Sequence, residues 1–233
     1  MKTISNKSKI VFLSTFPPTQ CGIATYTQDT IKGITDVYGK SIKCEICELV
    51  NEPKEHPTQA YTLNTKNKAE YAKVAEEINK DEAVKLVHIQ HEFGLFSGNY
   101  GDDLLDFLNV IKAPVTYTFH SVIPNPNDEL RTFVKLLLSY SNSVFVMTNK
   151  SKEILIKDYE IDEEIITCVP HGTHIVIYET PEKAKEKLNI QDRLVLSTFG
   201  LLGEGKNIET GLQALPTIIE KAPNALYLII GKT

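Results

Sequence analysis

The sequence predicts an α/β fold in which a domain with a mostly parallel sheet is followed by an incomplete second domain of the same kind. Short apolar runs, each long enough for one strand, alternate with segments that carry apolar residues at helical spacing. The interior runs are nearly continuously apolar, as strands of a buried parallel sheet are. The same alternation starts again after a break near residue 170. Because such alternation forms right-handed crossovers, we expect helices over both faces of the sheet.

Residues 9–14 form the first predicted strand because they are apolar and rich in β formers. Pro17 and Pro18 follow, and proline fits neither a strand interior nor a helix interior. Gly22 then opens a helix that extends to Tyr38, with apolar residues at helical spacing. A glycine turn at a helix N-terminus exposes unpaired N–H groups, which favours an anion or ligand site. An ordinary βα turn is the competing interpretation, because the turn lacks the G-x-G-x-x-G pattern.

The rest of the first domain continues the alternation of strands and helices. We expect a loop over residues 51–66, which are mostly polar and contain prolines. The predicted strands are 42–50, 84–91, 114–119, 143–147 and 165–169, and the predicted helices are 67–79, 102–111, 127–140 and 151–157.

A turn at Pro170-His-Gly172 ends the first domain, which comprises residues 1–172. Residues 173–190 are a linker with a short charged helix, and residues 191–233 begin the second domain. The second domain has a strand at 194–199, a glycine-rich loop at 200–205, a helix at 206–220 and a strand at 225–230. One such βαβ unit cannot cover its own sheet edges or build an independent core. We therefore expect the chain to be a fragment of a longer protein.

Composition excludes several classes of protein. The formal net charge is −5 and the chain has two arginines, Arg131 and Arg193, which argues against a nucleic-acid surface. No apolar run approaches the ~18 residues of a membrane span, and the polar N-terminus precedes a run too short for a signal peptide. Four free thiols fit the cytoplasm, which is the expected location. Cys44 and Cys47 are three residues apart in a predicted strand, so they face opposite sides and do not form a zinc half-site.

Polar residues cluster where predicted strands end. His91 ends the 84–91 strand and Glu92 follows it, and His120 and Ser121 follow the 114–119 strand. Ligands of open parallel sheets bind at the carboxyl ends of strands, so these residues are candidates for a site, although His120 could also be an ordinary loop histidine. His88 lies inside a strand, and we expect it to be a hydrogen-bonded core histidine.

The glycine-rich loop of the second domain repeats this pattern. Gly203, Gly205 and Lys206 lie between a strand and a predicted helix. A lysine at a helix N-terminus opposes the helix dipole, unless an anion such as a diphosphate lies between them. A solvated surface lysine is the competing interpretation.

Five segments together resemble the retaining glycosyltransferases of family 4, which have the GT-B fold. They are Pro-Pro-x-x-Cys-Gly-Ile-Ala-Thr-Tyr at 17–26, His-Ile-Gln-His-Glu-Phe-Gly at 88–94, Thr-Phe-His at 118–120, Val-Pro-His-Gly at 169–172 and Phe-Gly-Leu-Leu-x-x-Gly-Lys at 199–206. The resemblance spans nearly the whole chain in the order of the family.

The resemblance implies two Rossmann-like domains that face each other across a cleft. The N-terminal domain mainly holds a saccharide or lipid-linked acceptor, and the C-terminal domain mainly holds a nucleotide-sugar donor. It implies hexosyl transfer with retention, with no metal and no cofactor beyond the donor substrate. We expect no nucleic-acid partner, and the resemblance allows a full-length protein to bind a membrane surface peripherally.

The resemblance also implies roles for individual residues. His120 is the expected catalytic residue, which reaches the transferring sugar, and Lys206 neutralises the leaving diphosphate. The acceptor or sugar cleft is expected to contain His91, Glu92 and Ser121. The loops near the donor phosphates and the acceptor are expected to contain Gly22, Ile23, Gly203, Gly205 and Lys206.

Two departures from the family pattern keep other functions open. Residues 200–206 contain no arginine, which usually partners the lysine, and the paired-glutamate motif would lie beyond Thr233. A non-catalytic truncated relative that binds saccharides or another protein is therefore the alternative, and we expect negligible transfer by the chain alone. A Rossmann dehydrogenase ranks last because Pro17-Pro18 occupies the place of G-x-G-x-x-G.

Overall fold

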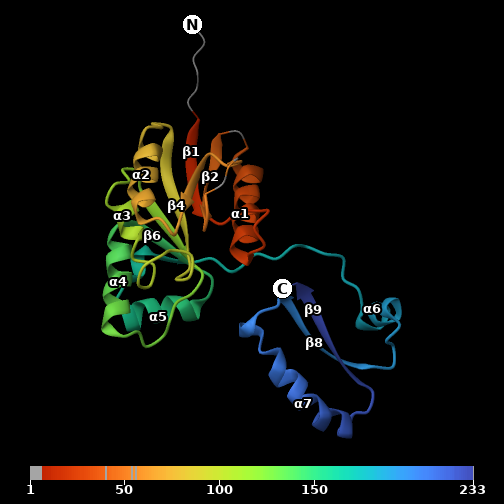
Figure 1. The fold of residues 1–233 in the computed structure, drawn as a ribbon. Helices are drawn as coiled ribbons and strands as arrows, with labels where there is room; N and C mark the ends of the chain where they lie inside the picture. Colours follow the sequence, from red (N-terminus) through yellow and green to blue (C-terminus); the bar gives the residue numbers. More distant parts are fainter. Residues whose placement is uncertain (1–6, 40, 54, 56, 233) are drawn as a thin grey trace. The chain divides into compact units, whose positions relative to one another are not determined.

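The computed structural model describes residues 7–39, 41–53, 55 and 57–232, and the chain forms two compact units (Figure 1). The first unit is Met1–Gly172 and the second is Thr173–Thr233. The division falls after the residue at which the sequence predicts the end of the first domain.

A parallel sheet forms the centre of the first unit, as the sequence predicts, and it has seven strands where the sequence predicts six. The strand order is β3-β2-β1-β4-β5-β6-β7, and all neighbours pair in parallel. The strands are β1 (Ser8–Ser14), β2 (Ile42–Val50), β3 (Tyr61–Asn64), β4 (Val84–His91), β5 (Val115–Phe119), β6 (Ser141–Val146) and β7 (Ile166–Cys168). The helices are α1 (Gly22–Tyr38), α2 (Lys68–Asn79), α3 (Leu104–Leu108), α4 (Asp128–Ser139) and α5 (Asn149–Tyr159), with a 3-10 turn η1 (Glu163–Ile165).

The edge strand β3 corrects the loop expected over residues 51–66, of which residues 54 and 56 lie outside the described part. Tyr61–Asn64 pairs in parallel with the end of β2, and Leu63 is fully buried. A four-residue strand with one fully buried apolar side chain leaves little periodic signal, and the polar residues before it conceal that signal. The first unit therefore has a seventh strand that extends the sheet beyond β2.

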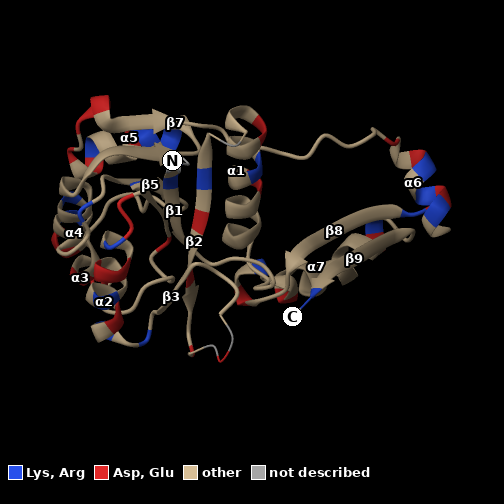
Figure 2. Ribbon diagram, turned by 90° about the horizontal axis from the view of Figure 1, so that it is seen from above, with Lys and Arg blue, Asp and Glu red and all other residues tan. Residues whose placement is uncertain are grey.

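Among the described residues of the first unit, the handedness of the crossovers places four helices on one face of the sheet and one on the other. The step from β1 to β2 moves in one direction across the sheet, and all steps from β3 onward move in the other direction. Right-handed crossovers therefore put α1 opposite α2, α3 and α4, as both views show (Figures 1 and 2). The side chains of α5 belong to the same core cluster as those of α2–α4. The main core thus lies between the sheet and these four helices.

Helices lie on both faces of the sheet, as the sequence predicts, but the second face is only partly covered (Figure 1). The connection from β2 to β3 contains no helix in its described residues, so α1 is the one described helix on this face. Beside α1 lies an open groove of about 300 Å³. Its apolar walls include Phe12, Leu86 and Phe145 from the strands and Ile34 from α1.

The second unit is one βαβ unit preceded by a short helix. It contains α6 (Pro181–Leu188), β8 (Leu194–Leu201), a 3-10 turn η2 (Glu204–Lys206), α7 (Ile208–Lys221) and β9 (Ala225–Lys232). The two strands pair in parallel with each other and not with the first sheet. They approach so closely that a Cβ built on Gly231 would lie 1.9 Å from the carbonyl oxygen of Gly200. Among the described residues of this unit only Ala225 is buried, so the unit has no core of its own.

We expect Asn79→Ala to destabilise the first unit. The Asn79 amide donates to the carbonyl oxygen of Val110 at 2.8 Å and accepts from the Lys112 N–H at 2.9 Å, which ties the end of α2 to the segment before β5. Loss of both bonds should lower the free energy of unfolding by about 1–3 kcal/mol, measured by urea denaturation with far-ultraviolet circular dichroism. The control is Lys80→Ala at an exposed neighbour, which should change stability by less than about 0.5 kcal/mol. Equal stability of the two variants would contradict this role.

Candidate functional site

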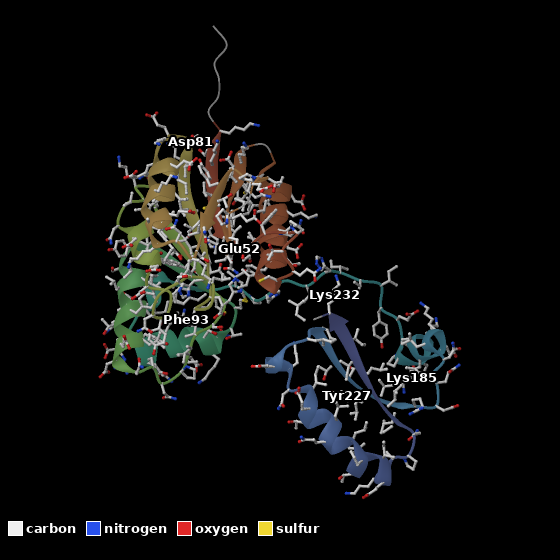
Figure 3. All side chains as sticks on the ribbon, viewed as in Figure 1. Glu52, Asp81, Phe93, Lys185, Tyr227 and Lys232 are labelled. Carbon is white, nitrogen blue, oxygen red and sulfur yellow. The ribbon has the colours of Figure 1, made fainter. Side chains whose placement is uncertain are left out.

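The predicted site residues of the first unit follow strands whose carboxyl ends meet at one edge of the sheet. Glu92 follows β4, and His120 and Ser121 follow β5, the neighbour of β4. Figure 3 labels Asp81, which precedes β4, and Phe93, which follows it, near opposite ends of the first unit. The sheet therefore brings Glu92, His120 and Ser121 together.

His120 is held by contacts from two elements of the first unit, β4 and α1. Its Nε2 lies 2.7 Å from Oε1 of Gln90 on β4, and its backbone N–H donates to the carbonyl oxygen of His91 at 3.0 Å. The Tyr26 ring on α1 meets the His120 ring edge-on at a centroid distance of 5.0 Å. The Tyr26 ring also lies near His171, at a centroid distance of 5.2 Å, from the Val-Pro-His-Gly segment. Three of the segments that carry the family resemblance thus converge on the Tyr26 ring.

Burial keeps the His120 ring neutral. The side chain is half-buried, and desolvation together with the nearby His171 lowers its pKa to about 4. A neutral imidazole has one N–H donor and one acceptor nitrogen. At neutral pH His120 can therefore donate or accept a hydrogen bond, but it carries no charge.

Glu92 and Ser121 form a hydrogen-bonded pair beside His120. The Ser121 hydroxyl donates to Oε2 of Glu92 at 2.5 Å, and the Phe93 N–H donates to Oε1 at 2.9 Å. Both carboxylate oxygens thus accept from the protein, and the half-buried pair joins the loop after β4 to the loop after β5. This geometry fits a carboxylate that orders the edge of the site.

His91 lies in the core and not in the predicted cleft. Its side chain is 0% exposed, and its ring centroid lies 4.7 Å from that of Phe119 and 5.0 Å from that of Phe93. Neither ring nitrogen has a hydrogen-bond partner in the described structure, and burial lowers the pKa of His91 to about 3. The cause is the pleat of β4, which sends successive side chains to opposite faces. Strict alternation along the strand predicts that His91 lies on the face opposite His88, which is where the structure has it.

His88 is a hydrogen-bonded core histidine, as the sequence predicts. Its Nδ1 lies 2.8 Å from Oγ1 of Thr116, and its Nε2 lies 3.0 Å from Oγ1 of Thr118. With both ring nitrogens occupied and a pKa lowered by burial to about 4, His88 is a neutral part of the sheet face.

The first glycine turn leaves the start of α1 open. The helix begins at Gly22 after an extended Cys21, and no side chain caps its first N–H groups. A Cβ built on Gly22 would meet no atom within 4 Å, and the following Ile23 is half-buried. The backbone is therefore accessible here, and the role of Gly22 and Ile23 near donor phosphates stays a prediction.

Lys206 lies in a different place from the one predicted. It ends the 3-10 turn η2, and the left-handed Asn207, with φ of 47°, separates this turn from α7. The Lys206 side chain folds back over Gly200, where an added Cβ would lie 3.2 Å from Nζ. Gly203 and Gly205 have open space around their Cα atoms. Lys206 is therefore outside the first turn of α7, and its contact with a diphosphate stays a prediction.

A polar hollow at the same edge of the first unit was missed from the sequence. It has a volume of about 340 Å³ and lies where β1, β2, β3 and β4 end. Its polar walls are Thr15, Thr19, Asn51, Glu52 and Thr65, and Oγ1 of Thr65 donates to Oδ1 of Asn51 at 3.3 Å. The strand-end rule could have found the residues after β2, but Thr65 follows the strand that the sequence did not reveal.

The described residues contain no group of three or more histidine, cysteine, aspartate or glutamate side chains arranged to hold a metal ion. Within the same residues, no helix combines the length and the apolar character needed to cross a membrane.

We expect His91→Leu to stabilise the protein in acid. The folded pKa of about 3 lies below the ordinary 6.5, so the unfolded state binds more protons between these values. Stability that is present above pH 6.5 is therefore lost as the pH falls, by up to about 1.4 kcal/mol per pH unit for this group. Urea denaturation across this range should show a shallower loss for His91→Leu, with equal or higher stability at neutral pH because two unpaired nitrogens are removed. Leucine at the exposed His174 is the control, and an equal slope in both variants would refute the argument.

Comparison with known proteins shows the fold. No family model and no curated protein sequence matches the chain. A glycosyltransferase structure from Rickettsia africae ESF-5 aligns with a TM-score of 0.61 at 15% identity, over 98% of this chain and 69% of that one. Anabaena HepE in complex with UDP and glucose aligns with a TM-score of 0.53 at 13% identity, over 96% of this chain and 69% of that one. The S. aureus MnaA–UDP structure aligns with a TM-score of 0.57 at 13% identity, over 96% of this chain and 62% of that one. The chain thus spans about two thirds of these proteins and has the α/β fold of GT-B type that the sequence predicts.

Proposed function

We propose that the chain is part of a retaining glycosyltransferase that moves a hexosyl group from a nucleotide sugar to a saccharide or lipid-linked acceptor. The observation that carries this proposal is the geometry of His120, a neutral half-buried imidazole at the carboxyl edge of the sheet beside Tyr26. Support comes from the shared fold with a glycosyltransferase and with HepE, which was solved with UDP and glucose.

The proposed chemistry assigns separate tasks to the groups of this chain. The bond from the anomeric carbon to the diphosphate oxygen breaks, and its electron pair leaves with the diphosphate. The acceptor oxygen bonds to that carbon on the same face, and the proton of the acceptor hydroxyl passes to the leaving diphosphate. Negative charge grows on the leaving diphosphate, so N–H groups and cations near it stabilise the transition state. The open start of α1 and Lys206 are suited to that task, whereas the neutral His120 is suited to hold a sugar hydroxyl.

The polar hollow beside Glu52 is the proposed acceptor subsite. It lies at the same edge of the first unit as His120, and its threonine hydroxyls, amide and carboxylate suit a ligand rich in hydroxyl groups. The exposed carboxylate of Glu52 can accept hydrogen bonds from an acceptor, which favours a saccharide at this position.

In a transfer-competent protein that contains this chain, we expect His120→Ala to lower kcat by about 10²–10³-fold while the KM for the acceptor changes much less. A positioned hydrogen bond to the reacting sugar acts mainly in the transition state, so its loss appears in the rate. The assay follows transfer from a panel of nucleotide hexoses, and proton NMR of the product reads the anomeric configuration. Alanine at the exposed His174 is the matched control. An unchanged turnover number in His120→Ala would refute the role, and inversion at the anomeric carbon would refute retention.

We expect Glu52→Ala to raise the KM for a saccharide acceptor about tenfold with little change in kcat, which corresponds to about 1.4 kcal/mol of binding. Glu82→Ala is the control, because Glu82 is exposed and precedes β4 at the opposite edge of the sheet. An equal KM in the two variants would show that the acceptor does not bind in this hollow.

A saccharide-binding module without catalysis is the second candidate, and the lack of an arginine in residues 200–206 favours it. We further propose that the chain alone transfers negligibly. Calorimetric titration with saccharides and nucleotide sugars, together with a donor-hydrolysis assay on this chain and on a longer protein that contains it, separates the candidates. Saccharide binding without donor turnover by either protein would favour the module.

A further inference from the structure

Gln90 is a fully buried polar residue in the centre of the sheet. It lies on β4, between β1 and β5, opposite Thr118, and its side chain is 0% exposed. Burial of an amide in a strand that otherwise needs apolar side chains costs free energy unless the amide is hydrogen-bonded. Its Oε1 meets Nε2 of His120 at 2.7 Å, while its Nε2 has no partner in the described structure. The one side-chain bond of Gln90 in the described part of the chain thus serves His120.

That bond determines which His120 nitrogen carries the proton. An amide oxygen can only accept, so Nε2 of His120 must be the donor. A neutral imidazole has one ring proton, so Nδ1 of His120 keeps its lone pair. His88, on the same face of the same strand as Gln90, has both ring nitrogens bonded to threonines and offers no such acceptor.

We propose that Gln90 is a positioning residue, which holds His120 as the Nε2–H tautomer so that Nδ1 accepts a hydrogen bond from a hydroxyl of the transferred sugar. The identity of the ligand as a sugar rests on the proposed function, whereas the tautomer does not. The donor would then need a hydroxyl at the position facing Nδ1, because a deoxy analogue would leave this acceptor unpaired.

The surroundings of His120 allow the charge of residue 90 to be used as a probe. Tyr26 contacts the ring directly, whereas His171 contacts Tyr26 and lies near enough for its charge to lower the pKa of His120. His88 and His91 lie on the strand of Gln90, and Glu92 follows that strand. Because burial lowers the His120 pKa, the ring is neutral in the wild type. A carboxylate in place of the Gln90 amide would favour imidazolium and raise that pKa.

The test is nitrogen-15 NMR of the histidine rings in the full chain at neutral pH, with Gln90→Met, Gln90→Glu and a Thr116→Val control. We expect Nε2–H for wild-type His120, with a slowly exchanging ring proton. Gln90→Met should lose that slow exchange and show mixed tautomers, and Gln90→Glu should raise the His120 pKa by a unit or more. Thr116→Val removes a partner of His88, so it should alter the His88 signals and leave those of His120 unchanged.

The outcomes are decisive for Gln90 whether or not sugar is transferred. Nδ1–H in the wild type, or an unchanged His120 ring in Gln90→Met, would overturn the proposal. If circular dichroism shows Gln90→Met to be unfolded, the wild type and Gln90→Glu decide it by tautomer and by pKa. Where transfer is measured, Gln90→Met should lower kcat about tenfold for the hydroxylated donor and leave a deoxy donor unaffected. Absence of transfer in every protein would refute the proposed function and leave the NMR result standing.

Discussion

The direction and handedness of the strand connections are the constraint on which the rest of the first unit depends. Since all neighbouring strands are parallel, their carboxyl ends meet at one edge, and residues far apart in the sequence come together there. Since the crossovers are right-handed, α1 is separated from α2–α5 by the sheet. His120, at the end of β5, therefore faces Tyr26 on α1 across a surface that no other described helix covers.

Within this frame the pleat of one strand gives three neighbouring residue positions different chemistry. His88 and Gln90 point to the α1 face, whereas His91 points into the main core. His88 has both nitrogens bonded, His91 has neither, and His120 has one bonded to Gln90. Three histidines with similarly lowered pKa values thus have a structural, an unsatisfied and a ligand-ready environment, which their residue type alone does not distinguish.

The alternation of apolar runs was sufficient to predict the parallel sheet, because such runs have few other stable arrangements. The strand-end rule was sufficient to bring His120, Glu92 and Ser121 together, since it needs only the strand direction. It did not separate His91 from Glu92, because the face of a residue depends on pleat parity and not on its nearness to a strand end. The position of Lys206 depends on one left-handed residue, Asn207, and the edge strand β3 depends on tertiary pairing with β2. The periodicity of apolar residues in the sequence reveals neither the position of Lys206 nor the strand β3.

The lone position of α1 also affects the dynamics of the site. This helix has two buried residues, Ala24 and Thr27, and one of its side-chain links to the sheet is the 2.7 Å bond from Thr27 to Ser14. The shorter α4 has five buried residues, all apolar. Local opening is easiest where few apolar contacts hold an element, so α1 detaches and re-forms more readily than α4. Tyr26 belongs to this helix and contacts the rings of His120 and His171. The ring environment of His120 therefore exists only while this helix is packed against the sheet.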